Sequence, residues 1–154
     1  MAFTRGLKIV AAAAALLVAT SISARAEDGW IVKSSAASVA ETADRLVAAI
    51  ENAGATVFAR VDHAAGAKSI DADLADMTLV MFGNPKIGTP ILQAAPSAGL
   101  DLPNRVLVWD DAGQTRVGYL DPAVLKQRHK VEGADAAFDV MAGALEKLTD
   151  AATN

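Results

Sequence analysis

Hydrophobic and polar positions follow two different periods along the chain, and each period predicts one kind of element. Apolar residues recur at helical spacing between Ser38 and Gly54, opposite a charged side, which predicts an amphipathic helix. Ser38 and Glu41 have the spacing of a capping box at its start, and Gly54 suits a left-handed end. Shorter apolar segments predict strands over residues 29–33, 56–61, 78–82, 105–109 and 115–120.

The segments between these strands are less regular. Residues 63–76 are small, acidic and weakly patterned, so we expect a loop with a short helical turn. Thr89 followed by Pro90 is an N-cap and first-turn proline combination that predicts a short helix ending near Pro96. The strand over 78–82 is apolar without alternation, which indicates burial on both faces or a central place in the sheet.

The C-terminal third predicts two more helices. Asp121 and Pro122 repeat the cap and proline combination, for a helix that reaches about His129. Gly133 separates it from a last helix. The apolar side of that helix consists of Ala137, Val140, Met141, Ala144, Leu145 and Leu148.

The order is therefore strand, helix, two strands, helix, hairpin, helix, helix. Residues 110–114 supply the turn of the hairpin. Strands joined by a hairpin need not be parallel, and helices that return between strand groups cover one face. We therefore expect an α+β two-layer sandwich, with a mostly antiparallel sheet and helices on one face. A doubly wound α/β fold is the alternative, and it would need stricter alternation.

The N-terminus has the pattern of a secretory signal. Arg5 and Lys8 precede an uncharged apolar segment over residues 9–19, and Ala24-Arg25-Ala26 predicts cleavage before Glu27. The apolar core is shorter than the roughly 20 residues of a membrane anchor, which is the competing interpretation. We expect residues 1–26 to be a cleaved signal peptide and 27–154 to be a single periplasmic or secreted domain.

Charge and cysteine content narrow the classes of partner. Cleavage would remove three of the 14 basic residues and none of the 18 acidic ones. This acidic excess argues against nucleic acid or a membrane surface as partner, since both are bound through clustered Lys and Arg. The chain has no Cys, so a lipoprotein anchor, disulfides and thiolate chemistry are excluded.

A glycine-containing segment between the strand at 78–82 and the next helix carries the most suggestive chemistry. Gly83 and Gly88 have the spacing of a phosphate-binding P-loop, but Thr89 stands where that motif needs Lys. This argues against a nucleoside triphosphatase. Amides at the helix start, with Lys86 and the Thr89 hydroxyl, could hold a small anion or a carboxylate. Alternatively, the glycines only permit a tight turn and Thr89 caps its own helix.

The two histidines give a second hypothesis. His63 follows Asp62 at a strand end, and folding could bring it near His129, Asp110 or Tyr119 as an acid/base pair or a metal site. No metal-ligand spacing supports this. Turn and capping roles explain Asp62 and His63 equally well, and the helix dipole explains His129. The serines, among them Ser97, lack the Gly-x-Ser-x-Gly elbow of esterases.

Several segments together resemble a known family. They are Phe58-Ala-Arg-Val-Asp-His63, Leu79-Val-Met-Phe-Gly-Asn-Pro-Lys-Ile-Gly-Thr-Pro90, Leu100-Asp-Leu-Pro103, Val106-Leu-Val-Trp-Asp110 and Tyr119-Leu-Asp-Pro122. The chain resembles the domain of unknown function 302 family over nearly all of residues 27–154. The resemblance implies a compact β-α-β-β-α-β-β fold with C-terminal helices, grouped with the TBP-like folds and often dimeric. It assigns no catalytic residue, so these motif positions have no role yet: Asp62, His63, Asn84, Lys86, Thr89, Asp110, Tyr119 and His129.

Two functional hypotheses follow, and the sequence identifies no cofactor for either. The preferred one is a non-enzymatic module that binds a small anion or carboxylate through residues 83–89, as a homodimer whose interface completes the pocket. Its expected ligand-binding residues are Asp62, His63, Asn84, Lys86, Gly88, Thr89 and Tyr119. The alternative is a hydrolase or metal-dependent enzyme that uses Asp62 and His63. A structural or stress-related partner protein without a pocket is a third interpretation.

Overall fold

The strands form a single antiparallel sheet. The computed structural model describes residues 24–25 and 29–154, so the predicted signal peptide lies outside the described residues except for 24–25. The sheet order is β1-β2-β6-β5-β4-β3, and every described neighbouring pair is antiparallel. The strands are β1 (Ala24–Arg25), β2 (Trp30–Ser35), β3 (Thr56–Asp62), β4 (Met77–Gly83), β5 (Asn104–Asp111) and β6 (Gln114–Leu120). The predicted α+β class is confirmed, and the doubly wound alternative is wrong.

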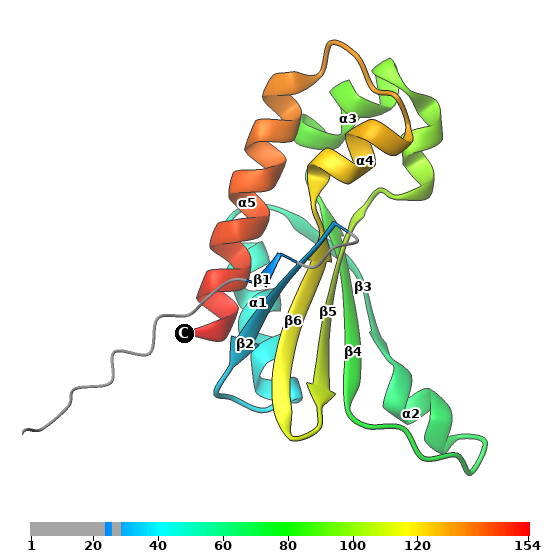
Figure 1. Ribbon diagram of the computed structural model, residues 1–154, viewed down its shortest axis with the longest axis vertical. Helices are drawn as coiled ribbons and strands as arrows, with labels where there is room; N and C mark the ends of the chain where they lie inside the picture. Colours follow the sequence, from blue (N-terminus) through cyan, green and yellow to red (C-terminus); the bar gives the residue numbers. More distant parts are fainter. Residues whose placement is uncertain (1–23, 26–28) are drawn as a thin grey trace, which may run out of the picture.

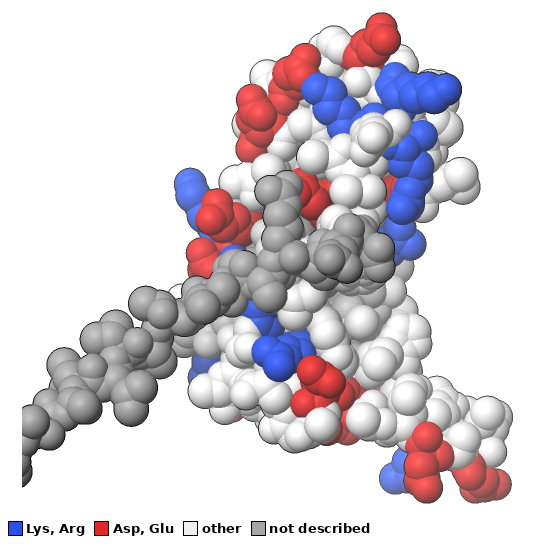
Figure 2. Space-filling view, in the orientation of Figure 1, with Lys and Arg blue, Asp and Glu red and all other residues white. Residues whose placement is uncertain are grey.

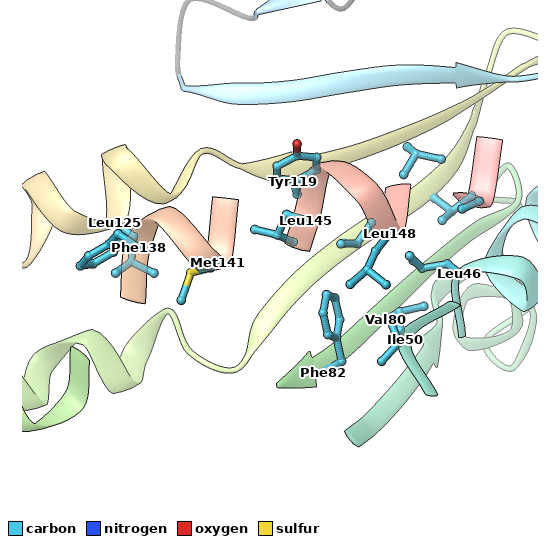
Figure 3. Packing of buried hydrophobic residues seen from close by; sticks show 14 of the residues in the cluster. Leu46, Ile50, Val80, Phe82, Tyr119, Leu125, Phe138, Met141, Leu145 and Leu148 are labelled. Carbon is cyan, nitrogen blue, oxygen red and sulfur yellow. The ribbon is translucent and has the colours of Figure 1, made fainter. Parts of the chain in front are cut away.

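Two long helices cover one face of the sheet. They are α1 (Val39–Asn52) and α5 (Asp135–Thr153), and Figure 1 shows α1 behind the sheet. The core lies between these helices and the sheet. In Figure 3, Leu46 and Ile50 of α1 lie beside Val80 of β4, and all three are fully buried.

The capping signals place two helices correctly. The Ser38 Oγ accepts a hydrogen bond from the Glu41 backbone N at 3.2 Å, and Gly54 follows α1 with a φ of 72°. The helix α4 (Pro122–Arg128) begins after Asp121, whose Oδ1 accepts from the Ala123 backbone N at 2.9 Å, and His129 is its C-cap. Local sequence therefore determines these boundaries.

The helix α3 (Pro85–Ala94) begins earlier than predicted. Its N-cap is Asn84, whose Oδ1 accepts from the Lys86 backbone N at 3.0 Å, and Pro85 occupies the first turn. Asn84 and Pro85 carry the same cap and proline combination as Thr89 and Pro90. The prediction that Thr89 is the N-cap is therefore wrong, and Pro90 lies inside the helix.

Two predicted apolar surfaces also differ from the structure. β4 is central, between β5 and β3, but its residues alternate between buried and half-buried rather than being buried on both faces. On α5, Val140 is 56% exposed and Phe138 takes its place in the core. Phe138 packs near Leu125 and Met141, as Figure 3 shows.

The two ends of the sheet carry different elements. At one end, which we call the α2 end, lie the short helix α2 (His63–Lys68) and the two-residue turn of the β5–β6 hairpin. The opposite end, which we call the α4 end, carries α3, the 3-10 helix η1 (Pro96–Leu100) and α4 (Figure 1). The antiparallel registers fix this division, because Asp62 pairs with Thr78 and Thr56 pairs with Gly83.

The second face of the sheet is apolar and lies opposite α1 and α5. Its residues are the alternate positions of the strands, including Trp30, Val32, Met77, Leu79, Met81, Leu107 and Trp109. Trp30 is 40% exposed, and on the edge strand Phe58 and Val61 are 60% and 38% exposed. We call this surface the open face.

Candidate functional site

Asp62 and His63 lie at the α2 end, and both are exposed. The Asp62 Oδ1 accepts a hydrogen bond from the Ala65 backbone N at 2.8 Å, so this carboxylate caps α2. This is the capping role that the sequence also allowed for Asp62. Across β4, this position is roughly 17 Å from Gly83 at about 3.4 Å per residue. No group of three or more His, Cys, Asp or Glu in the described part of the chain could hold a metal ion.

Tyr119 lies on the covered face of the sheet, beneath α5. Its side chain is almost fully buried, and it lines a hollow together with Lys33 and Glu146. Burial raises the pKa of the Tyr119 hydroxyl, and the nearby carboxylates of Glu146 and Asp150 raise it further. Tyr119 therefore belongs to a different part of the molecule from the Gly83–Thr89 segment.

The Gly83–Thr89 segment runs from the last residue of β4 into the first part of α3, and it forms one wall of a hollow. Asn84, Gly88 and Thr89 line this hollow, whose volume is about 290 Å³, whereas Lys86 does not. The other walls come from Phe58, Leu92, Leu102, Pro103 and Asn104. We call it the α3 pocket.

The backbone amides at the start of α3 already have acceptors within the chain. The Lys86 N donates to the Asn84 side chain, and the Ile87 and Gly88 N atoms donate to the Asn84 O at 2.9 and 3.0 Å. An anion at this helix start would have to replace these hydrogen bonds. The segment thus brings three of the expected ligand-binding residues together, but it offers an anion few free donors.

A second pocket lies beside the α3 pocket, at the α4 end. Its volume is about 270 Å³, and its polar lining consists of Asp101, Asn104, Arg105 and Arg128. Its remaining lining consists of Trp30, Leu79, Leu107, Leu120, Pro122, Leu125, Met141 and Leu145. Asn104 lines both pockets. We call this second hollow the arginine pocket.

Asp101 organises the polar side of the arginine pocket. Its carboxylate oxygens lie 2.7 Å from the Arg105 Nη2, 2.9 Å from the Arg128 Nη1 and 2.8 Å from the His129 Nε2. Burial alone would raise the pKa of Asp101, but the hydrogen bonds from His129 and Arg128 and the charges of Arg128 and Arg105 lower it overall. Two guanidinium groups therefore face one carboxylate, which leaves one surplus positive charge.

The two guanidinium groups remain accessible while Asp101 does not. The Asp101 side chain is 10% exposed, against 44% for Arg105 and 52% for Arg128. Figure 2 shows Lys and Arg side chains gathered over α4 and along its side of the molecule, and α4 carries Lys126 and Arg128 in its last turn. A small anion can therefore approach the positive charge from solvent.

His129 connects this cluster to η1. Its Nε2 faces Asp101, and its Nδ1 lies 3.1 Å from the Ser97 Oγ. The His129 side chain is only 7% exposed, whereas Ser97 is exposed. A chain of two hydrogen bonds therefore connects Ser97 to His129 and His129 to Asp101.

Sequence reasoning placed His129 at a helix end but missed its partners. Asp101 and His129 are 28 positions apart, and no local pattern joins them. The available signal was the Leu100-Asp-Leu-Pro103 segment in the family resemblance, together with the Asp101 and Arg105 spacing of four residues. Neither signal alone indicates which helix would pack against them.

The fold and the pocket define a two-layer α+β domain with a hollow at one end of its sheet. The chain belongs to the family described as Domain of unknown function DUF302, whose model matches residues 30–148. The crystal structure of an uncharacterized conserved DUF302 protein from Bacillus stearothermophilus has a TM-score of 0.73 and 18% identity. That match covers 80% of this chain and 98% of the other, and it shows the shared fold alone.

Curated relatives come from Brucella. The protein named Fluoride-specific ion channel FluC 1 of Brucella suis biovar 1 is 42% identical over 117 residues, which are 75% of this chain and 46% of that protein. Fluoride-specific ion channel FluC 2 of Brucella melitensis biotype 1 is also 42% identical, over 43% of its length. The chain thus spans less than half the length of these relatives. Within its described residues, no helix is both long and apolar enough to cross a membrane.

Proposed function

We propose that the chain is a ligand-binding domain whose arginine pocket takes a small organic carboxylate with an apolar body. The observation that carries this proposal is the surplus positive charge of Arg105 and Arg128 at the edge of an apolar hollow of about 270 Å³. A planar guanidinium matches the geometry of a carboxylate. The apolar lining would bury the rest of the ligand.

The size and charge of the pocket limit the ligand class. A volume of about 270 Å³ is at the small end of ligand sites, which are typically about 300–1,000 Å³. One surplus charge suits a monoanion, and Asp101 would repel a ligand with several negative charges. We therefore favour a short aliphatic or aromatic monocarboxylate over a nucleotide or a polyphosphate.

Calorimetric titration with octanoate tests this function, with 1-octanol as the neutral ligand of the same chain length. We expect octanoate to bind at least about tenfold more tightly than octanol, because only octanoate engages a charged hydrogen bond. Arg128→Gln should weaken octanoate binding by about 10- to 100-fold. Lys86→Gln, which removes the same charge from the first turn of α3, should leave octanoate binding unchanged.

Each other result counts against the proposal. If Lys86→Gln and Arg128→Gln reduced octanoate affinity equally, the result would favour a site at the start of α3, where the sequence predicted it. Equal affinity for octanoate and octanol would leave the arginines without a role in recognition. No binding of either ligand would favour a structural or stress-related partner protein.

The names of the Brucella relatives favour fluoride as a second candidate ligand. The matching segment accounts for less than half of those proteins, so their channel activity is not transferred to this chain. We propose that the same surplus charge could attract fluoride to this domain. Fluorine NMR titration of fluoride, with chloride at equal ionic strength as competitor, tests it. A fluoride shift that Arg128→Gln abolishes would support this candidate, and an unchanged fluoride signal would exclude it.

We also propose that the open face binds a second copy of the chain, giving a homodimer. The exposed Trp30, Phe58 and Val61 lie on this face, and large apolar patches of this kind mark interaction sites. Light scattering should report a dimer that Val61→Lys converts to a monomer. Val140→Lys, on the exposed side of α5, is the matched control and should not change the mass. A monomeric wild-type protein would contradict the proposal.

We also propose that the chain is exported, because residues 1–26 have the pattern of a secretory signal. Cleavage before Glu27 would remove β1 and leave β2 as the edge of the sheet. Intact-mass analysis of protein from the periplasmic or medium fraction of a bacterial host should give a chain that begins at Glu27. An uncleaved chain in the cytoplasmic fraction would contradict export.

A further inference from the structure

Ser97 has the surroundings of a reactive serine. It lies in the first turn of η1, it is exposed, and its Oγ is 3.1 Å from the His129 Nδ1. The other described serines have different partners. The exposed Ser69, for example, donates its hydroxyl to the Gly66 O at 2.7 Å.

Asp101 determines which nitrogen of His129 can act as a base. The ionised Asp101 carboxylate only accepts hydrogen bonds, so the His129 Nε2, 2.8 Å away, must carry the proton. In the neutral ring, Nδ1 then holds a lone pair and accepts the Ser97 hydroxyl proton. Nucleophile, base and orienting carboxylate therefore stand in the order used by serine hydrolases, although the two ring nitrogens exchange places.

We propose that Ser97 is an activated serine that takes the acyl group of small carboxylic esters. The Ser97 Oγ attacks the ester carbonyl carbon, and its proton passes to the His129 Nδ1. The ester C–O bond breaks, and the alcohol leaves with that proton. Water then attacks the acyl-serine ester, returns a proton through His129 to the Ser97 Oγ and releases the carboxylic acid.

This activity goes beyond ligand binding and does not depend on it. Ser97 is not part of the lining of the arginine pocket, although Asp101 belongs to both. Arg105 and Arg128 oppose the positive charge that His129 gains when it takes the proton. Because His129 takes a proton in both steps, we expect slow acylation of Ser97 and slow hydrolysis of the acyl-serine rather than fast turnover.

Acetylation by p-nitrophenyl acetate tests the proposal. The rate of nitrophenolate release would be followed, and the acetylated residues would be mapped by peptide mass spectrometry. We expect the acetyl group on Ser97 and not on Ser69, which is an internal control that needs no variant. Ser97→Ala should abolish this adduct, and His129→Gln should slow it by about 100-fold or more. Ser69→Ala should react like the wild-type protein.

Two results would overturn the proposal. One is acetylation confined to lysines, with Ser97 unmodified. The other is wild-type labelling of Ser97 in folded His129→Gln, with folding checked by circular dichroism. If His129→Gln does not fold, the comparison of Ser97 with Ser69 in the wild-type protein still decides. Octanoate binding by Ser97→Ala, which should match that of the wild-type protein, separates failure of this proposal from failure of the binding function.

Discussion

Asp101 joins three segments of the chain through one carboxylate. It follows η1, it contacts Arg105 at the start of β5, and it contacts Arg128 and His129 at the end of α4. A carboxylate that is only 10% exposed has lost most of its hydration, and these hydrogen bonds replace it. Asp101 should therefore stabilise the α4 end of the molecule as well as shape the pocket.

Replacing Asp101 tests this role directly. Asp101→Asn keeps the shape but removes the charge, so we expect the free energy of unfolding to fall by about 1–3 kcal/mol. Asp44→Asn is the control, because Asp44 pairs with Arg60 on an exposed surface. Its effect should stay within about 1 kcal/mol. Urea unfolding of both variants measures the difference, and equal effects would contradict the role assigned to Asp101.

The stability of the folded protein at acid pH should also depend on the Asp101 carboxylate. The pKa of Asp101 is lower in the folded protein than its ordinary value of 3.8. Its stabilising contribution is therefore present above that value and is lost as the pH falls through the lower, folded pKa. The wild-type urea midpoint should fall more steeply below pH 3.8 than that of Asp101→Asn. Parallel curves for the two proteins would contradict this assignment.

Among the elements, α3 shows where local sequence signals compete. Asn84-Pro85 and Thr89-Pro90 both predict a helix start, and the first one is used. Ile87 and Ile91, four positions apart, share a helix face, and both pack against the core. Only a helix that begins at Asn84 includes both residues. Tertiary packing therefore decides between two equivalent caps, and it outweighs the cost of Pro90 inside the helix.

Gly88 distinguishes the observed helix from the tight turn that the sequence also allowed at this position. It lies inside α3, and an added Cβ would meet no atom within 4 Å. Gly88→Ala should therefore raise the free energy of unfolding by about 0.5–1 kcal/mol, because Ala favours a helix. Gly29→Ala should have the opposite effect on the free energy of unfolding. Gly29 has a φ of 77°, and a Cβ there would overlap the Val124 side chain of α4.

Thermal and urea unfolding of both glycine variants give the measurement. Gly29→Ala should destabilise the protein by about 1–3 kcal/mol, through backbone strain and overpacking. A loss of stability in Gly88→Ala would instead indicate a glycine that needs its conformational freedom, as a tight turn would.

At the scale of the whole molecule, topology separates residues that the sequence grouped together. His63 follows β3 and Asn84 follows β4, and both positions come just after a strand. Since β3 and β4 are antiparallel, these two strand ends lie at opposite ends of the sheet. Strands, caps and the α+β class could be predicted because they depend on nearby residues. The contacts of Asp101 could not be predicted, because they depend on the packing of the end of α4 against η1, which is distant in the sequence.

The apolar strand β4 also has an environment that depends on the whole fold. Its sequence predicts burial on both faces or a central place in the sheet. The strand is central, but α1 and α5 cover only one of its faces. The half-buried Leu79 and Met81 on the open face explain the lack of alternation. A second copy on this face would supply the missing cover, which is why the oligomeric state bears on the account of the sheet as well as on function.

NMR can locate a bound carboxylate on the protein directly. In a titration of the ¹⁵N-labelled protein with octanoate, we expect the largest shifts at the side-chain Nε–H of Arg105 and Arg128 and the indole N–H of Trp30, which line the arginine pocket. The amides of Gly88 and Thr89, in the α3 pocket, should move little. Shifts centred on Gly88 and Thr89, or no shifts at millimolar octanoate, would contradict the claim that the arginine pocket is the ligand site.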